Sequence, residues 1–160
     1  RSSTSSLTGR SRSSATVSAI AARVAGTSAT PTLALIPNTP QPRQVREVLL
    51  LADGHPVVFA RSLLPRRNVR GAWNLFHGMG ARPLGAALFA DPAISRSPLA
   101  CMRFDARDAR YHRARSVLAS LDASVAMPHD LWARRSVFRL RGRALLVSEF
   151  FLPAIFDLPR

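Results

Sequence analysis

The sequence predicts an α+β fold in which an antiparallel sheet carries helices packed on one face. Two hairpin patterns predict the sheet, one between Gln44 and Leu64 and one between Leu131 and Pro153. Short helical patterns lie between them, and strands that pair with nearest neighbours while helices collect on one side define this class. With 160 residues and 47% hydrophobic content, the chain is long enough for one domain with its own core.

The first hairpin is marked by its turn. Two β-type runs, Gln44 to Ala52 and Pro56 to Leu64, flank Asp53-Gly54, a dipeptide typical of two-residue hairpin turns. Alternation places Arg46 with the apolar residues of one arm and Arg61 with those of the other, so both are expected to point inward. The opposite face of the first arm is nearly as apolar, so periodicity leaves its orientation open.

The segment between the hairpins predicts two short helices, over residues 68–80 and 83–89, the second with Pro83 near its first position. Free backbone N–H groups at a helix start, including that of Leu84, form an anion site, although an ordinary packing helix explains the same pattern. Residues 92–130 are less informative, and their Arg-rich part, Arg103 to Arg115, indicates a solvated face or loop.

Glu149 is the most informative residue of the second hairpin, which turns at Arg141-Gly142. It is one of only two glutamates, and alternate strand positions place it with Leu145, Val147 and Phe151. Burying an unpaired carboxylate costs about several kcal/mol, so such a residue is either paired with an arginine or used in chemistry. The alternative is that Glu149 lies on the solvent-exposed face of an edge strand.

The charge balance is strongly basic, with 23 arginines, no lysine, nine acidic residues and a formal net charge of +14. Such a balance is typical of proteins that bind nucleic acid or an anionic small molecule, and a GC-rich genome that favours arginine codons produces it as well. The arginines are scattered and do not form one basic helix with interleaved aromatics. We therefore expect no nucleic-acid partner.

Several site classes lack their signatures. The single cysteine, Cys101, excludes an intramolecular disulfide and suits a reducing compartment, and the four histidines have no metal-binding spacing. No G-x-S-x-G elbow, P-loop or G-x-G-x-x-G occurs. Apolar stretches are shorter than the ~20 residues of a membrane span. We expect a cytoplasmic protein without a metal and without stable membrane insertion.

Residues 1–42 are poorly specified. No acidic residue precedes Glu47, eight serines fall in the first twenty residues, and the proline-rich stretch 37–42 indicates a linker. We expect regular structure to begin after this linker, in a single domain over residues 43–160.

Four segments, taken together in their order and spacing, resemble the chorismate pyruvate-lyase family. They are Val45 to Gly54 with Pro56; Ala60-Arg61-Ser62 ending at Pro65; Arg82-Pro83-Leu84-Gly85 followed by Leu88-Phe89; and Leu131 to Ser136 leading to Ser148 to Ala154. The resemblance spans about residues 43–154. The chain departs from the family pattern at Arg143-Ala144, where a proline commonly precedes paired leucines, and in residues 102–130, which are longer than the usual connection.

The resemblance implies a sheet of about six antiparallel strands, helices on one face, and a closed site beneath two flaps. It implies conversion of chorismate to 4-hydroxybenzoate and pyruvate, the first committed step of ubiquinone biosynthesis, by a monomer without a cofactor. In similar enzymes an arginine and two amides hold the ring carboxylate, here Arg46, Leu84 and, on a weaker match, Leu7. A glutamate that meets the ring hydroxyl corresponds to Glu149, the expected catalytic residue. We assign Arg61 to the pyruvyl carboxylate, unless it instead neutralises Glu149.

The alternative is a non-catalytic module of the same fold that binds a small-molecule effector, as in the UTRA domains of bacterial transcription regulators. Such modules normally follow a winged-helix DNA-binding domain, for which we expect no counterpart in this chain.

Overall fold

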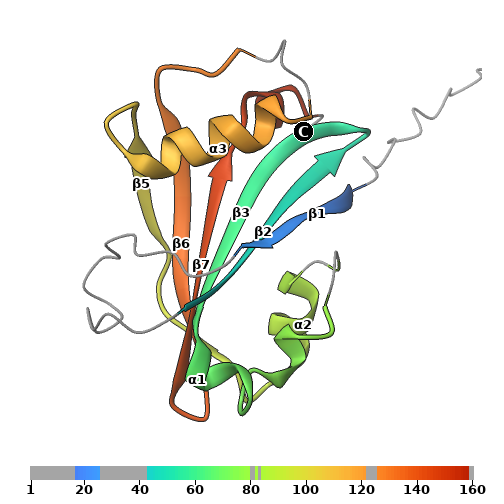
Figure 1. Cartoon of the computed structure of the whole chain (residues 1–160), viewed down its shortest axis with the longest axis vertical. Coiled ribbons are helices and arrows are strands. Elements are labelled where there is room, and N and C mark those ends of the chain that lie inside the picture. The colour runs from blue at the N-terminus through green and yellow to red at the C-terminus, as the bar shows by residue number, and fades with distance from the viewer. Residues whose placement is uncertain (1–16, 26–42, 80–81, 83, 122–125, 159–160) are drawn as a thin grey trace, which may run out of the picture.

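The computed structural model describes residues 17–25, 43–79, 82, 84–121 and 126–158, and the side chains of all of these except 17–25 and 43. A twisted antiparallel sheet runs the length of the molecule in Figure 1. Its strands follow the order β1-β2-β3-β7-β6-β4, and β5 also pairs with β6. The strands are β1 (Val17–Ala25), β2 (Arg43–Ala52), β3 (His55–Pro65), β4 (Ser95–Arg96), β5 (Ala100–Phe104), β6 (Leu131–Leu140) and β7 (Arg143–Phe151).

Both predicted hairpins are confirmed, and their turns explain why they form. Asp53 and Gly54 have φ values of 49° and 84°, and Arg141 and Gly142 have 49° and 71°. Two successive residues in the left-handed region match the twist of the flanking strands, and glycine takes the second position without strain. The hairpins β2–β3 and β6–β7 then join through β3 and β7 to form the centre of the sheet.

A β-bulge in the first hairpin decides which residues share a face. The register shifts between Leu50 and Leu51, so that Leu51 pairs with Pro56 but Leu50 pairs with Val58. β3 has one extra residue at this point. Every later side chain on β3 therefore points to the opposite face of the sheet from the one expected for a regular pairing with β2. As a result Arg46 lies opposite Ser62, whereas Glu47 lies opposite Arg61.

Helix α3 (Ala109–Ala119) covers one face of the sheet. Its buried residues pack with sheet residues that include Leu49, Phe59 and Phe150. Asp108 caps the helix by accepting a hydrogen bond from the backbone N–H of Arg110, at 2.8 Å. The Arg-rich segment, Arg103 to Arg115, thus comprises the end of β5, a loop and the first turns of α3. Arg103, Arg107 and Arg115 are exposed, which agrees with the predicted solvated face or loop, but the helix itself was not predicted.

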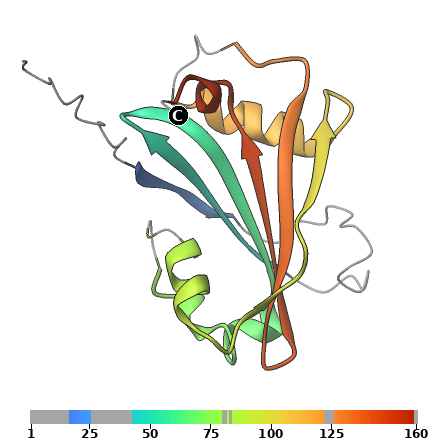
Figure 2. The same cartoon turned by 180° about the vertical axis from the view of Figure 1, so that it is seen from behind.

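A second group of helical turns lies on the opposite face, as Figures 1 and 2 show from front and back. It comprises α1 (Arg66–Val69), η1 (Asn74–Phe76) and α2 (Leu84–Ala90). The helix predicted over residues 68–80 is thus two short pieces. Trp73 ties them to the sheet, because it is fully buried and donates through Nε1 to the carbonyl of Arg143 at 3.0 Å.

The predicted α+β class with an antiparallel sheet is confirmed, and the helices occupy parts of both faces. Strand β1 was not predicted, since it lies within the segment that the sequence leaves poorly specified. The chain continues after β7 into η2 (Pro153–Asp157). None of the described helices is long and apolar enough to cross a membrane.

Candidate functional site

A cavity of about 200 Å³ lies between α2 and the face of the sheet opposite α3. Its floor follows two rows of paired residues that cross the strands β2, β3, β7 and β6 in turn. The first row is Arg46, Ser62, Val147 and Ser136, and the second is Val48, Ala60, Glu149 and Arg134. In the first row Ser62 and Val147 lie between Arg46 and Ser136, whereas in the second row Val48 and Ala60 are followed by the polar pair Glu149 and Arg134. A cavity that combines apolar side chains with a few polar groups is suited to a small ring with charged substituents.

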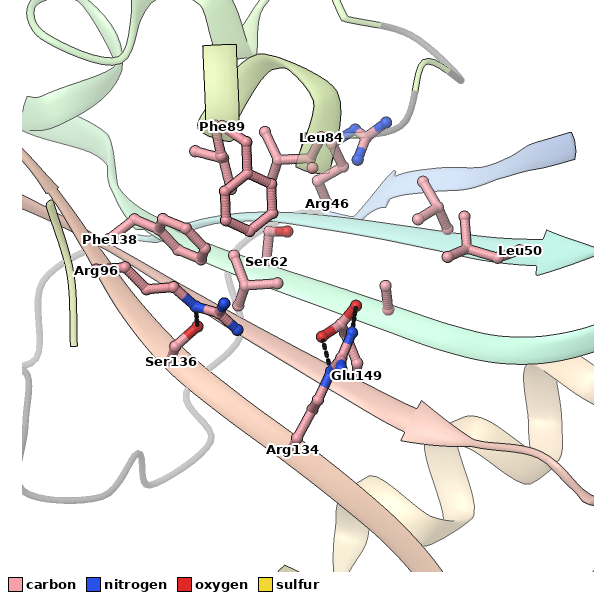
Figure 3. Close-up of a pocket in the computed structure, with 15 residues that line it drawn as sticks. Arg46, Leu50, Ser62, Leu84, Phe89, Arg96, Arg134, Ser136, Phe138 and Glu149 are labelled. Carbon is pink, nitrogen blue, oxygen red and sulfur yellow. Dashed lines mark hydrogen bonds and ion pairs between the residues drawn. The ribbon is translucent and has the colours of Figure 1, made fainter. Parts of the chain in front are cut away.

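Glu149 is held in the cavity by its cross-strand neighbour, Arg134 (Figure 3). Arg134 donates from Nε to one carboxylate oxygen at 2.6 Å and from Nη2 to the other at 3.2 Å. The Glu149 side chain is 24% exposed and that of Arg134 is 41% exposed, so the pair lies partly in solvent. The hydrogen bonds to Glu149 raise the pKa of Arg134. Glu149 is thus neither unpaired nor deeply buried.

Arg46 lies at the β2 side of the cavity and is only 5% exposed. Burial lowers its pKa, because removal from water disfavours the charged form. Its Nη2 donates to the carbonyl of Arg82 at 2.5 Å, which fixes the side chain against the chain that leads into α2 (Figure 3). A deep guanidinium beside a helix start is well suited to bind a carboxylate.

Leu84 is the first residue of α2, is buried, and lines the same cavity. The helix predicted there is confirmed, although Pro83 lies outside the described residues. Leu7, the weaker candidate for a second amide, also lies outside them. Arg46, Leu84 and Glu149 thus come from three separate elements, β2, α2 and β7, and meet at one cavity.

Arg61 does not reach this cavity. Its side chain lies on the α3 face, where its Nε is 3.3 Å from Oε1 of Glu47. Arg113 from α3 also binds Glu47, through Nε at 3.1 and 3.0 Å and through Nη2 at 2.5 Å. Burial lowers the pKa of Arg61, while the charge of Glu47 acts in the opposite direction. The inward direction predicted for Arg61 is correct, but it points to the other face because of the bulge.

Two further arginines line the cavity and were missed by sequence reasoning. One is Arg134, and the other is Arg96 of β4, whose Nε donates to Oγ of Ser136 at 3.1 Å. The Arg141-Gly142 turn carried a signal for Arg134, because counting back along both strands from that turn places it opposite Glu149. The sequence around Arg96 carries no comparable signal, since β4 has only two residues.

No group of three or more His, Cys, Asp or Glu side chains within the described ranges is placed to hold a metal ion. Cys101 is a free, exposed thiol. The polar side chains that line the cavity are the guanidinium groups of Arg46, Arg96 and Arg134, the carboxylate of Glu149 and the hydroxyls of Ser62 and Ser136.

The fold is an α+β sheet, and three arginines and one glutamate surround the apolar part of its cavity, a lining of the kind found in pockets for small anionic molecules. Residues 2–160 match the family described as chorismate lyase, and the chain belongs to that family. A probable chorismate pyruvate-lyase of Aromatoleum aromaticum is 67% identical over 115 residues, which are 72% of this chain and 60% of that protein. One from an Azoarcus species is 66% identical over 116 residues, again 72% and 60%. A third, from Thiobacillus denitrificans, is 52% identical over 111 residues, which are 69% of this chain and 56% of that protein. The chain thus matches about 60% of the length of the first two relatives.

Proposed function

We propose that this protein converts chorismate to 4-hydroxybenzoate and pyruvate. The observation that carries the proposal is the meeting of Arg46, Leu84 and Glu149, three residues assigned by resemblance, at one cavity. Membership of the chorismate lyase family supports it, as do the names of the relatives. The product would supply ubiquinone biosynthesis, and we expect a cytoplasmic monomer that acts without a cofactor.

The reaction is an elimination. The C3–O bond to the enolpyruvyl group breaks, the C4 proton leaves, and the new C3–C4 double bond completes the aromatic ring. The enolpyruvyl oxygen takes the electron pair of the broken bond, and protonation of its methylene carbon yields pyruvate. Aromatisation supplies the driving force, so the protein needs only to orient the dianion, assist one proton transfer and stabilise the departing charge.

In the proposed binding mode Arg46 and the backbone amide of Leu84 hold the ring carboxylate at the deep side of the cavity. Glu149 accepts a hydrogen bond from the C4 hydroxyl and assists the proton transfer, and Arg134 keeps its carboxylate oriented. Leu7 remains a candidate for a second amide. Arg61 is left without substrate contact, because its guanidinium pairs with Glu47 on the other face.

The proposal is tested by mixing the purified protein with chorismate and following 4-hydroxybenzoate and pyruvate together. We expect both products in equal amounts. A protein that binds 4-hydroxybenzoate but releases neither product from chorismate would instead favour the effector-binding alternative.

Arg46→Ala is expected to weaken 4-hydroxybenzoate binding by about 2–5 kcal/mol, the range for truncating one partner of a buried charged pair. Arg46→Lys should restore little, because a point charge does not reproduce a planar fork. Isothermal titration with 4-hydroxybenzoate measures both. Arg139→Ala is the matched control, since Arg139 is exposed on β6 outside the cavity. Normal affinity in Arg46→Ala would remove this residue from the site.

Leu84→Ala is expected to change turnover only modestly, because the proposed contact uses the backbone amide and not the side chain. Some loss of stability is expected as well, since the buried Leu84 side chain packs in the cluster that includes Leu88 and Phe138. Steady-state kinetics beside a thermal melt separates the two effects. A severe loss of turnover with an unchanged melting temperature would implicate the side chain itself.

A further inference from the structure

Arg96 differs from the other arginines of the cavity in its contacts. Arg134 is committed to Glu149 by two hydrogen bonds. Arg46 is buried and donates to the carbonyl of Arg82. Arg96 is exposed and makes one hydrogen bond, to Ser136, and no carboxylate pairs with it in the part of the chain that the structure describes. It is therefore a cation at the cavity rim whose charge is not neutralised by a neighbouring acid.

Two aromatic rings hold the Arg96 guanidinium in place. Its central carbon lies 5.5 Å from the ring centroid of Phe89 and 5.5 Å from that of Phe138. The two rings meet edge to face with centroids 6.1 Å apart. Cation–π contacts at this distance stabilise the charge without consuming its N–H donors. The hydrogen bond to Ser136 uses only Nε of Arg96. The two terminal nitrogens of the guanidinium are thus left for a ligand, and they point toward the cavity in Figure 3.

The sheet register places Arg96 and Arg46 on opposite sides of the floor. Arg46 starts the row that crosses Ser62 and Val147 and ends at Ser136, the residue that binds Arg96. Three interstrand steps separate the backbones at the two ends, about 14 Å at the usual spacing. Both side chains line the cavity, Arg46 at its β2 side and Arg96 at its β6 side. A ring that carries a carboxylate at each side would therefore meet one guanidinium at each end of this row.

Chorismate carries two carboxylates, one on the ring and one on the enolpyruvyl group. We propose that Arg96 binds the enolpyruvyl carboxylate, while the deeper Arg46 binds the ring carboxylate. Arg96 takes this role only if the cavity binds chorismate as proposed above. The ring then lies over Ala60, Ser62 and Val147, and the departing group lies at the rim, where pyruvate can leave first.

The test compares two ligands that differ in the enolpyruvyl group. Arg96→Gln is expected to lower kcat/KM for chorismate about 10- to 100-fold, the range for one hydrogen-bonded charge contact. Its Kd for 4-hydroxybenzoate, which lacks the second carboxylate, should stay within about 2-fold of wild type. Arg96→Lys keeps the charge but not the planar guanidinium, so its kcat/KM for chorismate should lie between those of the wild type and Arg96→Gln. Arg139→Gln, on the adjacent strand but outside the cavity, is the matched control.

Unchanged 4-hydroxybenzoate binding also shows that a variant retains its cavity. If Arg96→Gln keeps wild-type kcat/KM for chorismate, or loses affinity for both ligands equally, the assignment of Arg96 is overturned while the proposed function stands. If the wild-type protein forms no product from chorismate, the proposed function falls, and the role of Arg96 falls with it.

Discussion

Glu149→Gln is expected to fold and to bind 4-hydroxybenzoate, but to lose about 10²–10⁴-fold in turnover, the usual scale of general acid–base assistance. The substitution keeps the shape of the side chain and removes its charge and its ability to accept a proton. Single-turnover assays with chorismate, beside titration with 4-hydroxybenzoate, measure the two quantities separately.

A purely structural role for Glu149 leads to another result. Its ion pair with Arg134 is partly exposed, so water can hydrate Arg134 when the carboxylate is lost, and the free energy of unfolding should fall by no more than about 1 kcal/mol. Turnover per folded molecule would then be near normal. Asp108→Asn is the matched control, because Asp108 makes a similar arginine pair with Arg110, away from the cavity.

Glu47→Gln is expected to lower the free energy of unfolding by about 3–5 kcal/mol, the cost of removing one partner from a buried ion pair. The Glu47 side chain is 1% exposed and contacts both Arg61 and Arg113. Without its charge these two cations would face each other across the interface between the sheet and α3. Urea unfolding measures the loss, and a variant as stable as wild type would contradict this account.

The second part of that prediction concerns the cavity. Glu47 lies on the α3 face, so the fraction of Glu47→Gln that remains folded should bind 4-hydroxybenzoate normally. The double variant Glu47→Met with Arg61→Met should recover part of the lost stability, because it removes two buried charges together. Substitutions of the two glutamates should therefore have different effects: Glu149→Gln should lower turnover, and Glu47→Gln should lower the free energy of unfolding.

The hairpins were predictable because their turns carry strong local signals. Asp53-Gly54 and Arg141-Gly142 take backbone angles that few dipeptides adopt easily, and the strands beside them are rich in apolar residues. The orientation of β2 was not predictable for a physical reason. Glu47 and Leu49 are buried beneath α3 while Arg46 and Val48 are buried on the other side, so the strand has no solvent-exposed face that would identify its orientation.

The candidate site was predictable only in part. Resemblance supplied Arg46, Leu84 and Glu149, but the place of Arg61 depends on a bulge that no residue pattern in the hairpin indicates. Counted regularly from the Asp53-Gly54 turn, Arg61 would lie opposite Arg46 on the same face. Helix α3 did have a signal that was overlooked, since Asp108 is a capping residue and the buried positions that follow have helical spacing.

Because of the bulge in the first hairpin, the number of residues in β3 also determines which of its side chains line the cavity. Val57 is the additional residue between the pairs Leu51–Pro56 and Leu50–Val58. Loss of any single residue there would exchange the faces of Arg61 and Ser62, bringing a fourth arginine to the cavity and leaving Glu47 without Arg61. A gain or loss of two residues would preserve both faces. Insertions and deletions in this strand therefore keep Arg61 and Ser62 on their present faces only if they involve an even number of residues, whichever amino acids are present.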